Sequence, residues 1–410
     1  MPVRFSQARL VALSQMPSSV VNSIDFEEEA VVPAESNLTQ SQYLIWLGQQ
    51  LTPREPLYNM AFAFDIFTEV DNRKFTHAFN QLVLAHDSLR IVIDLRGAVP
   101  VQRVLEDVPR PLELIEMASA DKQDIAACLS ELGRENLNLA QCTYSSKLIS
   151  VAENHSIWFF CQHHIACDIW SFELLHDRLQ QLYKSDAADF TWSQFTQYKN
   201  WEREYRRGSK YAAHALYWKQ KLTVPFPPLN IYRHRMGTSA RSRRLSESLG
   251  FNKSTALKQL ASGISGSLNR DLGVFAILAA TTTALLFRLS GNRMIRLGAP
   301  FHNRTTPDRK QVSGLLLEIL VLNIEIDINE SITSLAKKIV EELTQALLNS
   351  GPGVSHPKIN RSFQVLLNYI PLSFPGFCAQ PGDAQWLHCG AGDPDHHLRL
   401  QVHDLNATGE

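Results

Sequence analysis

The stretch "SIWFFCQHHIACDIWSFELL" (156–175) joins a hydrophobic run to an amphipathic pattern and carries two adjacent histidines between them. The hydrophobic run predicts a strand that ends near the histidines, and the amphipathic pattern predicts a helix after them. Neighbouring side chains of a strand point to opposite faces, so only one of His163 and His164 can face a given cleft. We therefore expect one imidazole to face a substrate and the other to support the structure, and we predict no metal site.

An aspartate, Asp168, follows this doublet by four residues, close to the predicted start of the helix. A neutral imidazole, with a pKa of about 6.5, can accept a proton at physiological pH. A buried carboxylate can hold the loop that presents the imidazole, provided that the carboxylate has a cationic partner. The stretch "LGAPFHNRTTPDR" (297–309) supplies Arg304 as that candidate, at a predicted strand-to-loop transition. The alternative is that the two histidines are ordinary interior residues and that Arg304 is exposed on a loop.

Composition places the chain among globular proteins with a sizeable core. Of its 410 residues, 44% are hydrophobic and 20% are charged, which excludes wholesale disorder and leaves room for two domains. The formal net charge of −1 gives no electrostatic case for nucleic acid as a partner. The six cysteines are scattered without a C-x-x-C pair, as expected in a reducing compartment.

The most apolar run is "VFAILAATTTALLF" (274–287), which is shorter than the ~20 residues that a membrane span needs. The start of the chain lacks the compact apolar segment of a signal peptide. We therefore predict a soluble, cytoplasmic protein with no membrane segment, in which the run 274–287 forms a buried helix.

Helical and strand patterns alternate along two halves of similar length. Helices are predicted at 38–51, 72–90, 121–135, 170–183, 192–222, 253–263, 271–289 and 331–349. Strands are predicted at 60–67, 91–97, 145–151, 156–162, 244–250, 294–299, 319–328, 361–369 and 397–403. We therefore predict an α/β fold made of two α+β lobes. The predicted domains are an N-terminal extension, 1–36, that is a possible docking segment, an N-terminal lobe, 37–222, an inter-lobe linker, 223–244, and a C-terminal lobe, 245–410.

The stretch "HHIACDIWSFELL" (163–175) resembles the H-H-x-x-x-D-G core of condensation domains of nonribosomal peptide synthetases. Further stretches resemble the other motifs of that family, in the family's order and over roughly residues 37–405. They are "LTQSQYLIWLGQQL" (38–51), "LAHDSLRIVI" (84–93), "FTQYKNW" (195–201), "LLFRLSGNRMIRLGAPFHNR" (285–304), "SGLLLEILVLNIEI" (313–326) and "NRSFQVLLNYI" (360–370). Any one of these motifs is weak, but the ordered set is specific.

The resemblance implies two chloramphenicol-acetyltransferase-like lobes in a V-shaped pseudo-dimer with a central tunnel. It implies acyl transfer from a carrier-bound thioester to an amine or hydroxyl acceptor, which forms an amide or ester in nonribosomal peptide or hybrid polyketide biosynthesis. A starter-type domain is one alternative within this family. The implied partners are donor and acceptor carrier proteins and adjacent synthetase or polyketide synthase modules. The domain itself binds no cofactor or metal, and the carriers present the phosphopantetheine arm. The implied catalytic set is His164, Asp168, Arg304 and His163. In the family, His164 lies beside the acceptor, Asp168 pairs with Arg304, and His163 is structural.

The chain also departs from the family's pattern. Ile169 stands where the family has glycine, Ala85 replaces the first arginine of the second motif, and Glu318 lies where the V-N-T region is expected. Glycine suits a positive φ or a close approach of backbone to ligand, and isoleucine suits neither. We therefore expect either an ordinary backbone at Ile169 or a narrower, more apolar tunnel floor, and we expect Ile169, Trp170, Ser171 and Glu318 to line the tunnel. The chain ends earlier than the family usually does, so the C-terminal lobe is expected to be truncated.

Other readings of the same motifs stay open at this point. A non-catalytic domain of this fold that docks carriers or recruits other enzymes is one alternative, although both histidines are intact. A stand-alone acyltransferase is another, although the D-F-G-W-G motif of the plant type is absent. An epimerisation domain shares the H-H-x-x-x-D-x-x-S pattern, but the E-G-H-G-R-E motif is absent.

Overall fold

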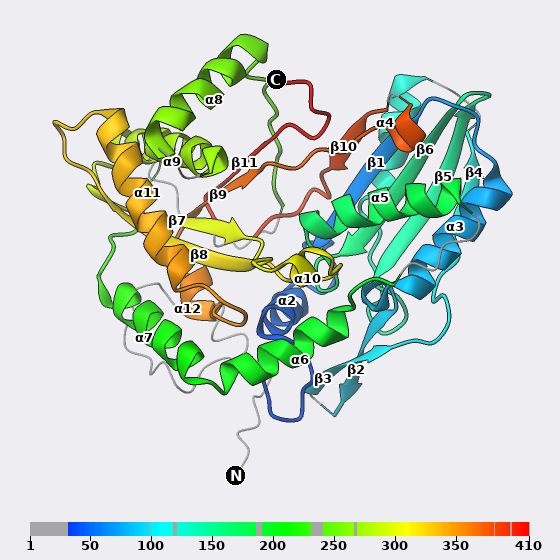
Figure 1. Ribbon diagram of the computed structural model, residues 1–410, viewed down its shortest axis with the longest axis horizontal. Coiled ribbons are helices and arrows are strands. Elements are labelled where there is room, and N and C mark those ends of the chain that lie inside the picture. The colour runs from blue at the N-terminus through cyan, green and yellow to red at the C-terminus, as the bar shows by residue number, and fades with distance from the viewer. Residues whose placement is uncertain are drawn as a thin grey trace.

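The structure is a computed structural model that describes residues 32–409 except 98, 118–120, 186–190, 230, 232–240, 266–268, 381 and 394–395. Most of the predicted extension 1–36, and the middle of the predicted linker 223–244, lie outside the described residues. The described chain forms two larger sheets that lie side by side, with helices packed on them and between them (Figure 1). The predicted α/β fold class is confirmed.

The first sheet has five strands, and its aromatic core faces two helices. In spatial order its strands are β10 (Ala384–Leu387), β1 (Asn59–Ile66), β6 (His155–His163), β5 (Tyr144–Ala152) and β4 (Glu113–Glu116). The helices that cover it are α3 (Asn72–Ala85), α4 (Lys122–Leu132) and α5 (Ile169–Lys184). Side chains alternate along β1 and β6, so one face, rich in phenylalanine, packs against α3 and α5, and the other packs against α4. This packing fixes where β6 ends and α5 begins.

The second sheet has four strands, in the order β11 (Leu398–His403), β9 (Val365–Ile370), β7 (Met294–Phe301) and β8 (Glu318–Glu325). Helices α9 (Arg270–Ser290) and α11 (Ile332–Leu348) pack on it, and α8 (Phe251–Ser265) packs against these two helices. By length and composition α9 could cross a membrane, and it is the one such helix in the described chain. Half of its most apolar window is buried, because α9 packs against the sheet, α8 and α11. It is therefore a core helix, as predicted for the run 274–287.

The remaining elements lie beside and between the two sheets. They are α2 (Gln40–Leu51), the hairpin of β2 (Ile91–Arg96) and β3 (Val99–Val104), α6 (Phe195–Arg206), α7 (Ser209–Thr223), α10 (Pro307–Lys310), α12 (Pro357–Asn360) and the 3-10 turns η2 (Asp87–Leu89) and η3 (Phe377–Ala379). Helix α2 lies between the two halves in Figure 1 and begins with a capping box, in which Thr39 and Gln42 satisfy each other's backbone N–H groups. The side chain of Gln42 also donates to the carbonyl oxygen of Ile165 over 3.1 Å. Helix α2 therefore supports the loop that carries the histidine doublet.

Two sequence predictions are wrong in detail. The aromatic segment 192–222 does not form one helix, because it breaks at Gly208, which is the N-cap of α7. The segment 244–250 forms no strand and is mostly exposed; beside it lies the isolated bridge between Arg241 and Ala391. A strand needs a hydrogen-bonded partner along its length, and no described strand pairs with this segment.

The chain also crosses between the sheets in a way that the sequence did not reveal. After β9 the chain leaves the second sheet, adds β10 to the edge of the first sheet, and returns as β11. Strand β10 pairs antiparallel with β1, and Trp386 lies opposite Phe62. The predicted lobe boundaries remain a prediction. The range 245–410 supplies all four strands of the second sheet and also β10 of the first sheet.

Candidate active site

The first histidine of the doublet is the last residue of β6 and is buried. The His163 ring accepts a hydrogen bond at Nδ1 from the backbone N–H of Ile165, over 3.2 Å. Its Nε2 therefore carries the hydrogen and donates to Oε1 of Gln49, also over 3.2 Å. Burial, with a smaller effect of His164, lowers the pKa of His163 to about 3, so this ring is neutral at physiological pH.

The second histidine lies in the turn after β6, at the wall of a pocket. Nδ1 of His164 lies 2.7 Å from the carbonyl oxygen of Cys167. A carbonyl oxygen only accepts, so Nδ1 carries the hydrogen and Nε2 is left as the proton-accepting atom. Burial lowers the pKa of His164, and the nearby guanidinium of Arg399 adds to that effect, while the Cys167 carbonyl and Asp168 oppose it. The ring is therefore a neutral base at physiological pH.

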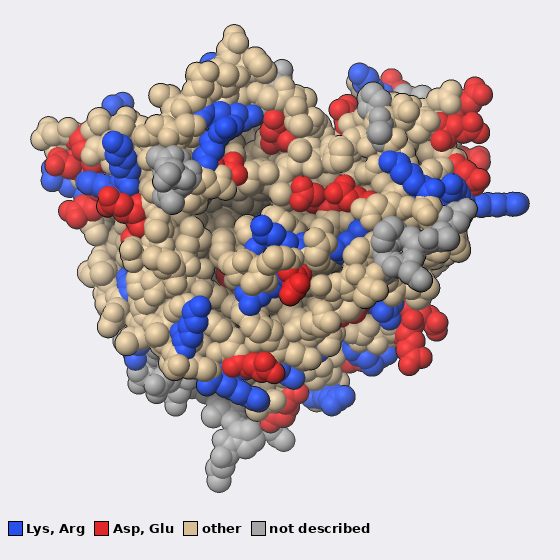
Figure 2. Space-filling view, viewed as in Figure 1, with Lys and Arg blue, Asp and Glu red and all other residues tan. Residues whose placement is uncertain are grey.

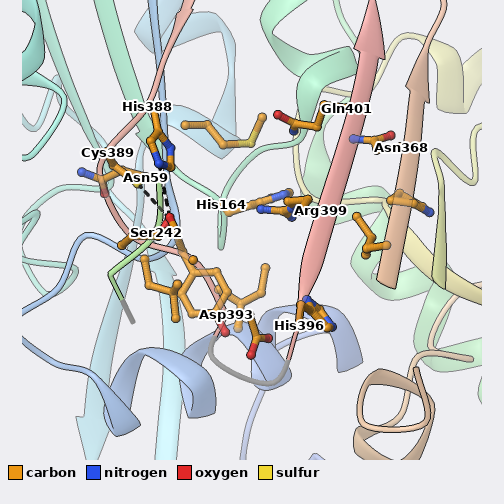
Figure 3. A pocket seen from close by; sticks show the side chains of 18 of the residues that line it. Asn59, His164, Ser242, Asn368, His388, Cys389, Asp393, His396, Arg399 and Gln401 are labelled. Atoms are coloured by element: carbon orange, nitrogen blue, oxygen red, sulfur yellow. Dashed lines mark hydrogen bonds between the residues drawn. The ribbon is translucent and has the colours of Figure 1, made fainter. Parts of the chain in front are cut away.

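The pocket beside His164 has a volume of about 720 Å³ and is lined by both halves of the molecule. His164 and Ile169 contribute from the first half, and Asn368, Arg399 and Gln401 contribute from β9 and β11 of the second (Figure 3). Figure 2 shows the surface hollowed near the middle of this view, between the two halves. This size and this mixture of apolar and polar walls suit a small-molecule reactant.

Asp168 and Arg304 do not line the pocket but join the two halves behind it. Asp168 caps the N-terminus of α5, and Arg304 lies just after β7. Nη1 of Arg304 donates to Oδ2 of Asp168 over 2.6 Å, and Nη2 donates to Oδ1 over 2.9 Å. Both side chains are buried, with 1% or less of their surface exposed. Bidentate geometry of this kind makes a buried pair both strong and directional.

Backbone groups satisfy the rest of this ion pair. The N–H groups of Ser171 and Leu316 each donate to Asp168 over 3.1 Å. Nη2 of Arg304 also donates to the carbonyl oxygen of Val312, over 3.1 Å. Because each partner is bonded on several sides, the pair holds the loop after β6 against the loop before β8.

The residues that the sequence placed in the tunnel separate into two groups. Ile169 lines the pocket, and as the first residue of α5 it is not among the described non-glycine residues with positive φ. Its backbone is therefore ordinary, and its side chain occupies part of the pocket wall. Trp170, Ser171 and Glu318 are not among the described residues that line this pocket, so their place in a tunnel wall stays a prediction.

These three side chains are instead engaged with neighbouring protein groups. Nε1 of Trp170 donates to the carbonyl oxygen of Lys310 over 3.0 Å. The hydroxyl of Ser171 lies 2.9 Å from Oδ1 of Asp168. The carboxylate of Glu318 is fully buried and accepts the backbone N–H groups of the 353–355 turn, over 2.7 and 2.8 Å. Each of the three side chains is therefore bonded to protein groups outside this pocket.

Sequence reasoning missed the polar residues that the second sheet presents to the pocket. Arg399 and Gln401 alternate with leucine and valine in "LRLQV" (398–402), which is the period of two of a strand with one polar face. That alternation is the signal that could have found them. Among the described residues, no group of three histidine, cysteine, aspartate or glutamate side chains could hold a metal ion.

Comparisons with known proteins indicate the family of this chain. The family model of the condensation domain matches residues 33–355. One of the proteins that form the plipastatin synthase of Bacillus subtilis (strain 168) is 26% identical over 306 residues, which are 73% of this chain and 8% of that protein. One of the proteins that form the linear gramicidin synthase of Brevibacillus parabrevis is 24% identical over 434 residues, covering 100% of this chain and 5% of that protein. The chain therefore spans less than a tenth of the length of either relative.

Solved structures show the same fold. A variant of the starter condensation domain of rhizomide synthetase, in complex with C8-CoA and Leu-SNAC, matches with a TM-score of 0.77 at 22% identity, covering 91% of this chain and 86% of that one. The first condensation domain of the calcium-dependent antibiotic synthetase, in complex with a substrate analogue, matches with a TM-score of 0.74 at 19% identity, covering 87% of this chain and 86% of that one. Because the family model covers most of the sequence and the fold agrees, the chain belongs to the condensation domains of nonribosomal peptide synthetases, a family of acyltransferases.

Proposed function

We propose that this chain transfers an acyl group from a carrier-bound thioester to an amine or hydroxyl acceptor, and that His164 is the general base or positions the acceptor. The observation that carries the proposal is the tautomer of His164. Because Nδ1 donates to the carbonyl of Cys167, Nε2 is left to accept a proton beside a pocket large enough for both reacting groups. Its lowered pKa keeps the ring neutral, which is the form that a base requires.

In the proposed step the acceptor nitrogen attacks the carbonyl carbon of the thioester. The C–N bond forms as the C–S bond breaks, and Nε2 takes the proton of the nitrogen and passes it to the sulfur, which leaves as the thiol of the phosphopantetheine arm. A hydroxyl acceptor gives an ester by the same transfers. A thioester is already activated, so alignment of the two reactants supplies much of the rate. Base assistance adds a factor of about 10²–10⁴, with the larger benefit for a hydroxyl because its pKa lies far from neutral.

Three further residues of the proposed catalytic set position His164 without touching substrate. His163 is anchored to Gln49 of α2 and ends β6 in register. Asp168 and Arg304 fix the start of α5, and thereby the turn that carries His164. We assign these three residues structural roles, in which they act through the loop.

We infer that the two halves correspond to lobes at 37–222 and 245–410 in a V-shaped pair, with a tunnel between them that is open on two faces. A pocket lined from both halves supports this inference. A donor carrier and an acceptor carrier would reach His164 from opposite faces, each on its phosphopantetheine arm. The relatives are subunits of the plipastatin and linear gramicidin synthases, which supports neighbouring synthetase modules as partners and a peptide antibiotic as product. A cytoplasmic location and a hybrid polyketide product are part of the proposal without that support.

The test is a condensation assay with the parent chain. A donor carrier loaded with an octanoyl group and an acceptor carrier loaded with leucine are mixed with the protein, and the condensed acceptor is followed by intact-protein mass spectrometry. His164→Ala is expected to lower the rate by about 10²–10⁴-fold. His77→Ala is the matched control, because His77 is exposed on α3 and, within the described chain, its ring is hydrogen-bonded to Gln81 one turn along the same helix.

The outcomes separate the alternatives. Product from the parent and loss of product in His164→Ala support the proposal. Product that is unchanged in His164→Ala refutes the base or positioning role. Carriers that bind the parent and form no product with any acceptor point instead to a docking or recruitment domain.

A further inference from the structure

Arg399 enters the pocket because of the register of the second sheet. Strand β11 runs parallel to β9, with Arg399 opposite Leu366 and Gln401 opposite Asn368. All four of these side chains line the pocket, because alternate residues of adjacent strands share one face of a sheet. The residues between them, Leu367 and Leu400, pack into the hydrophobic core with α9 and α11. A shift of the β11 register by one residue would turn the Arg399 side chain out of the pocket, so the register of the sheet fixes where Arg399 lies.

Arg399 and His164 line the same pocket, and the charge of Arg399 acts on the ring of His164. Figure 3 shows the two side chains next to each other in the pocket, with Asn368 and Gln401 on the neighbouring strands. The positive charge of Arg399 contributes to the lowered pKa of His164, which requires the two groups to lie close together. The ion pairs of the described residues do not include Arg399. The side chain is exposed to the pocket. Burial lowers the pKa of Arg399 and the charge of Asp393 opposes that effect, but in the part of the chain that the structure describes Arg399 makes no bidentate pair of the kind that Arg304 makes with Asp168.

The pocket as a whole is cationic, although the chain carries a net charge of −1. The arginines among its described lining residues are Arg241, Arg243, Arg244 and Arg399. The one carboxylate in the described wall is Asp393. A concave site with such an excess of positive charge attracts anions.

We propose that Arg399 binds a carboxylate carried by one of the two reactants, so that the carboxylate is held beside the reacting carbonyl and His164. The planar guanidinium presents paired N–H donors that match the two oxygens of a carboxylate. The side-chain amides of Asn368 and Gln401 add neutral donors on the same wall. The phosphate of the carrier's arm is not the anion in question, because the whole pantetheine chain separates it from the thioester. The substrate class is therefore an acyl donor with a second carboxylate, or a free amino acid that replaces the carrier-bound acceptor and so keeps its α-carboxylate. This inference rests on the proposed acyl transfer at His164.

The test measures binding, so that it does not depend on turnover. The glutaryl and pentanoyl thioesters of N-acetylcysteamine are a donor pair that differs in the terminal carboxylate, and leucine and leucinamide are the acceptor pair. Each is titrated into the parent, Arg399→Gln, Arg399→Lys and the control Arg103→Gln by calorimetry. Arg103 is on β3, and its side chain is 57% exposed in an ion pair with Asp94, outside the pocket.

The expected result is that the parent binds the carboxylate form of one pair about tenfold or more tightly than its neutral form. Arg399→Gln abolishes that preference, Arg399→Lys keeps part of it because the charge remains without the fork, and Arg103→Gln leaves it unchanged. The pair that shows the preference identifies the donor or the acceptor as the anionic reactant. A parent with no preference in either pair, or an Arg399→Gln protein that keeps it, overturns the inference. Condensation is measured separately in the carrier assay, so an inactive parent that still shows the Arg399-dependent preference refutes the catalytic proposal alone.

Discussion

The carboxylate of Asp168 and the guanidinium of Arg304 form two parallel hydrogen bonds across 136 residues of sequence, and thereby join α5 to the loop that follows β7. The pair is buried, and backbone groups satisfy both partners from neighbouring turns. Because these hydrogen bonds occupy both carboxylate oxygens of Asp168, the carboxylate is not available to bind substrate. Its effect on the reaction passes through the turn at His164, whose Nδ1 is held by the carbonyl of the residue just before Asp168.

Removing one partner of this pair should destabilise the whole fold. Asp168→Asn leaves the Arg304 charge buried and without a carboxylate, and we expect the free energy of unfolding to fall by about 3–5 kcal/mol. The double variant Asp168→Leu with Arg304→Met should recover much of that loss, because no charge stays buried. Urea denaturation measures both. The control Arg103→Gln removes an exposed ion pair and should cost at most about 1 kcal/mol. An Asp168→Asn protein whose stability stays within about 1 kcal/mol of the parent would contradict the assigned role.

Alanine substitutions of the two histidines should have different effects, with His163→Ala lowering stability more and His164→Ala lowering the condensation rate more. His163→Ala removes the donor to Gln49 and the acceptor of the Ile165 N–H in a buried site, and should cost about 1–3 kcal/mol for each group left unsatisfied. His164→Ala removes one hydrogen bond at the pocket wall, so its cost should be about 1 kcal/mol while its condensation rate collapses. Denaturation curves and rates per folded molecule, measured on both variants, check this division. Equal losses of stability would show that both rings are structural.

Sequence patterns predicted the elements on either side of the histidines, because each has a local cause. A strand that ends at the histidines and a helix that begins beside Asp168 are both encoded in neighbouring residues, so β6 and α5 could be expected before the structure. The pairing of Asp168 with Arg304 spans 136 residues, and it could be expected only because the ordered motifs resemble those of a known family.

Long-range placement could not be predicted in the same way. Glu318 lies within a tunnel-associated motif, yet the turn at 353–355 captures its carboxylate in the core, and nothing near Glu318 in the sequence encodes that turn. Strand β10 is four residues long and joins the first sheet only because the chain crosses back to β1. The alternation of polar and apolar residues around Arg399 is visible in the sequence. The position of Arg399 opposite His164, however, depends on how the two sheets face each other.

The pH dependence of condensation should report the charge of Arg399. Only the neutral ring of His164 accepts a proton, so the rate falls as pH drops through the pKa of His164, which burial and Arg399 hold below its ordinary value. Arg399→Gln removes the cation, so that pKa should rise and the acid limb of the rate profile should move to higher pH. The profile is measured with neutral reactants, so that lost carboxylate binding does not interfere. A limb that stays in place would show that the two side chains do not interact in the working enzyme.

Ile169 should restrict the acyl or acceptor group that reaches His164. Its side chain lines the pocket, and truncation to alanine enlarges the wall at the start of α5 without changing the backbone. We expect Ile169→Ala to raise the ratio of kcat/KM for a branched donor to kcat/KM for an unbranched donor by about tenfold. This is the change in selectivity that one or two methylene groups produce in an apolar pocket. Leu84→Ala, on the exposed side of α3, is the control for loss of apolar volume. If both alanine variants keep the parent's selectivity, Ile169 does not limit the substrate.

A buried carboxyl pair between α6 and β8 should make the fold less stable as pH rises. Burial, with repulsion from Glu318, raises the pKa of Glu202 to about 8, and burial raises the pKa of Glu318 to about 7. The folded state then binds more protons than the unfolded chain between the ordinary glutamate pKa of 4.5 and about pH 8, so the free energy of unfolding declines across that window. The decline is measured by denaturation at a series of pH values.

Glutamine at position 202 tests which carboxyl is responsible. Oε1 of Glu202 accepts the backbone N–H of Gln40, and Oε2 has no hydrogen-bond partner among the described residues, so Glu202→Gln keeps the one bond that is made and removes the proton linkage. We expect a flatter pH dependence in Glu202→Gln and no change in Glu204→Gln, its exposed neighbour on α6. Glu318→Gln should instead destabilise at every pH, because both Glu318 oxygens accept backbone N–H groups and an amide nitrogen cannot replace either. If stability declined with pH as steeply in Glu202→Gln as in the parent, Glu202 would not carry the proton linkage, and the raised pKa of Glu318 would remain as its source.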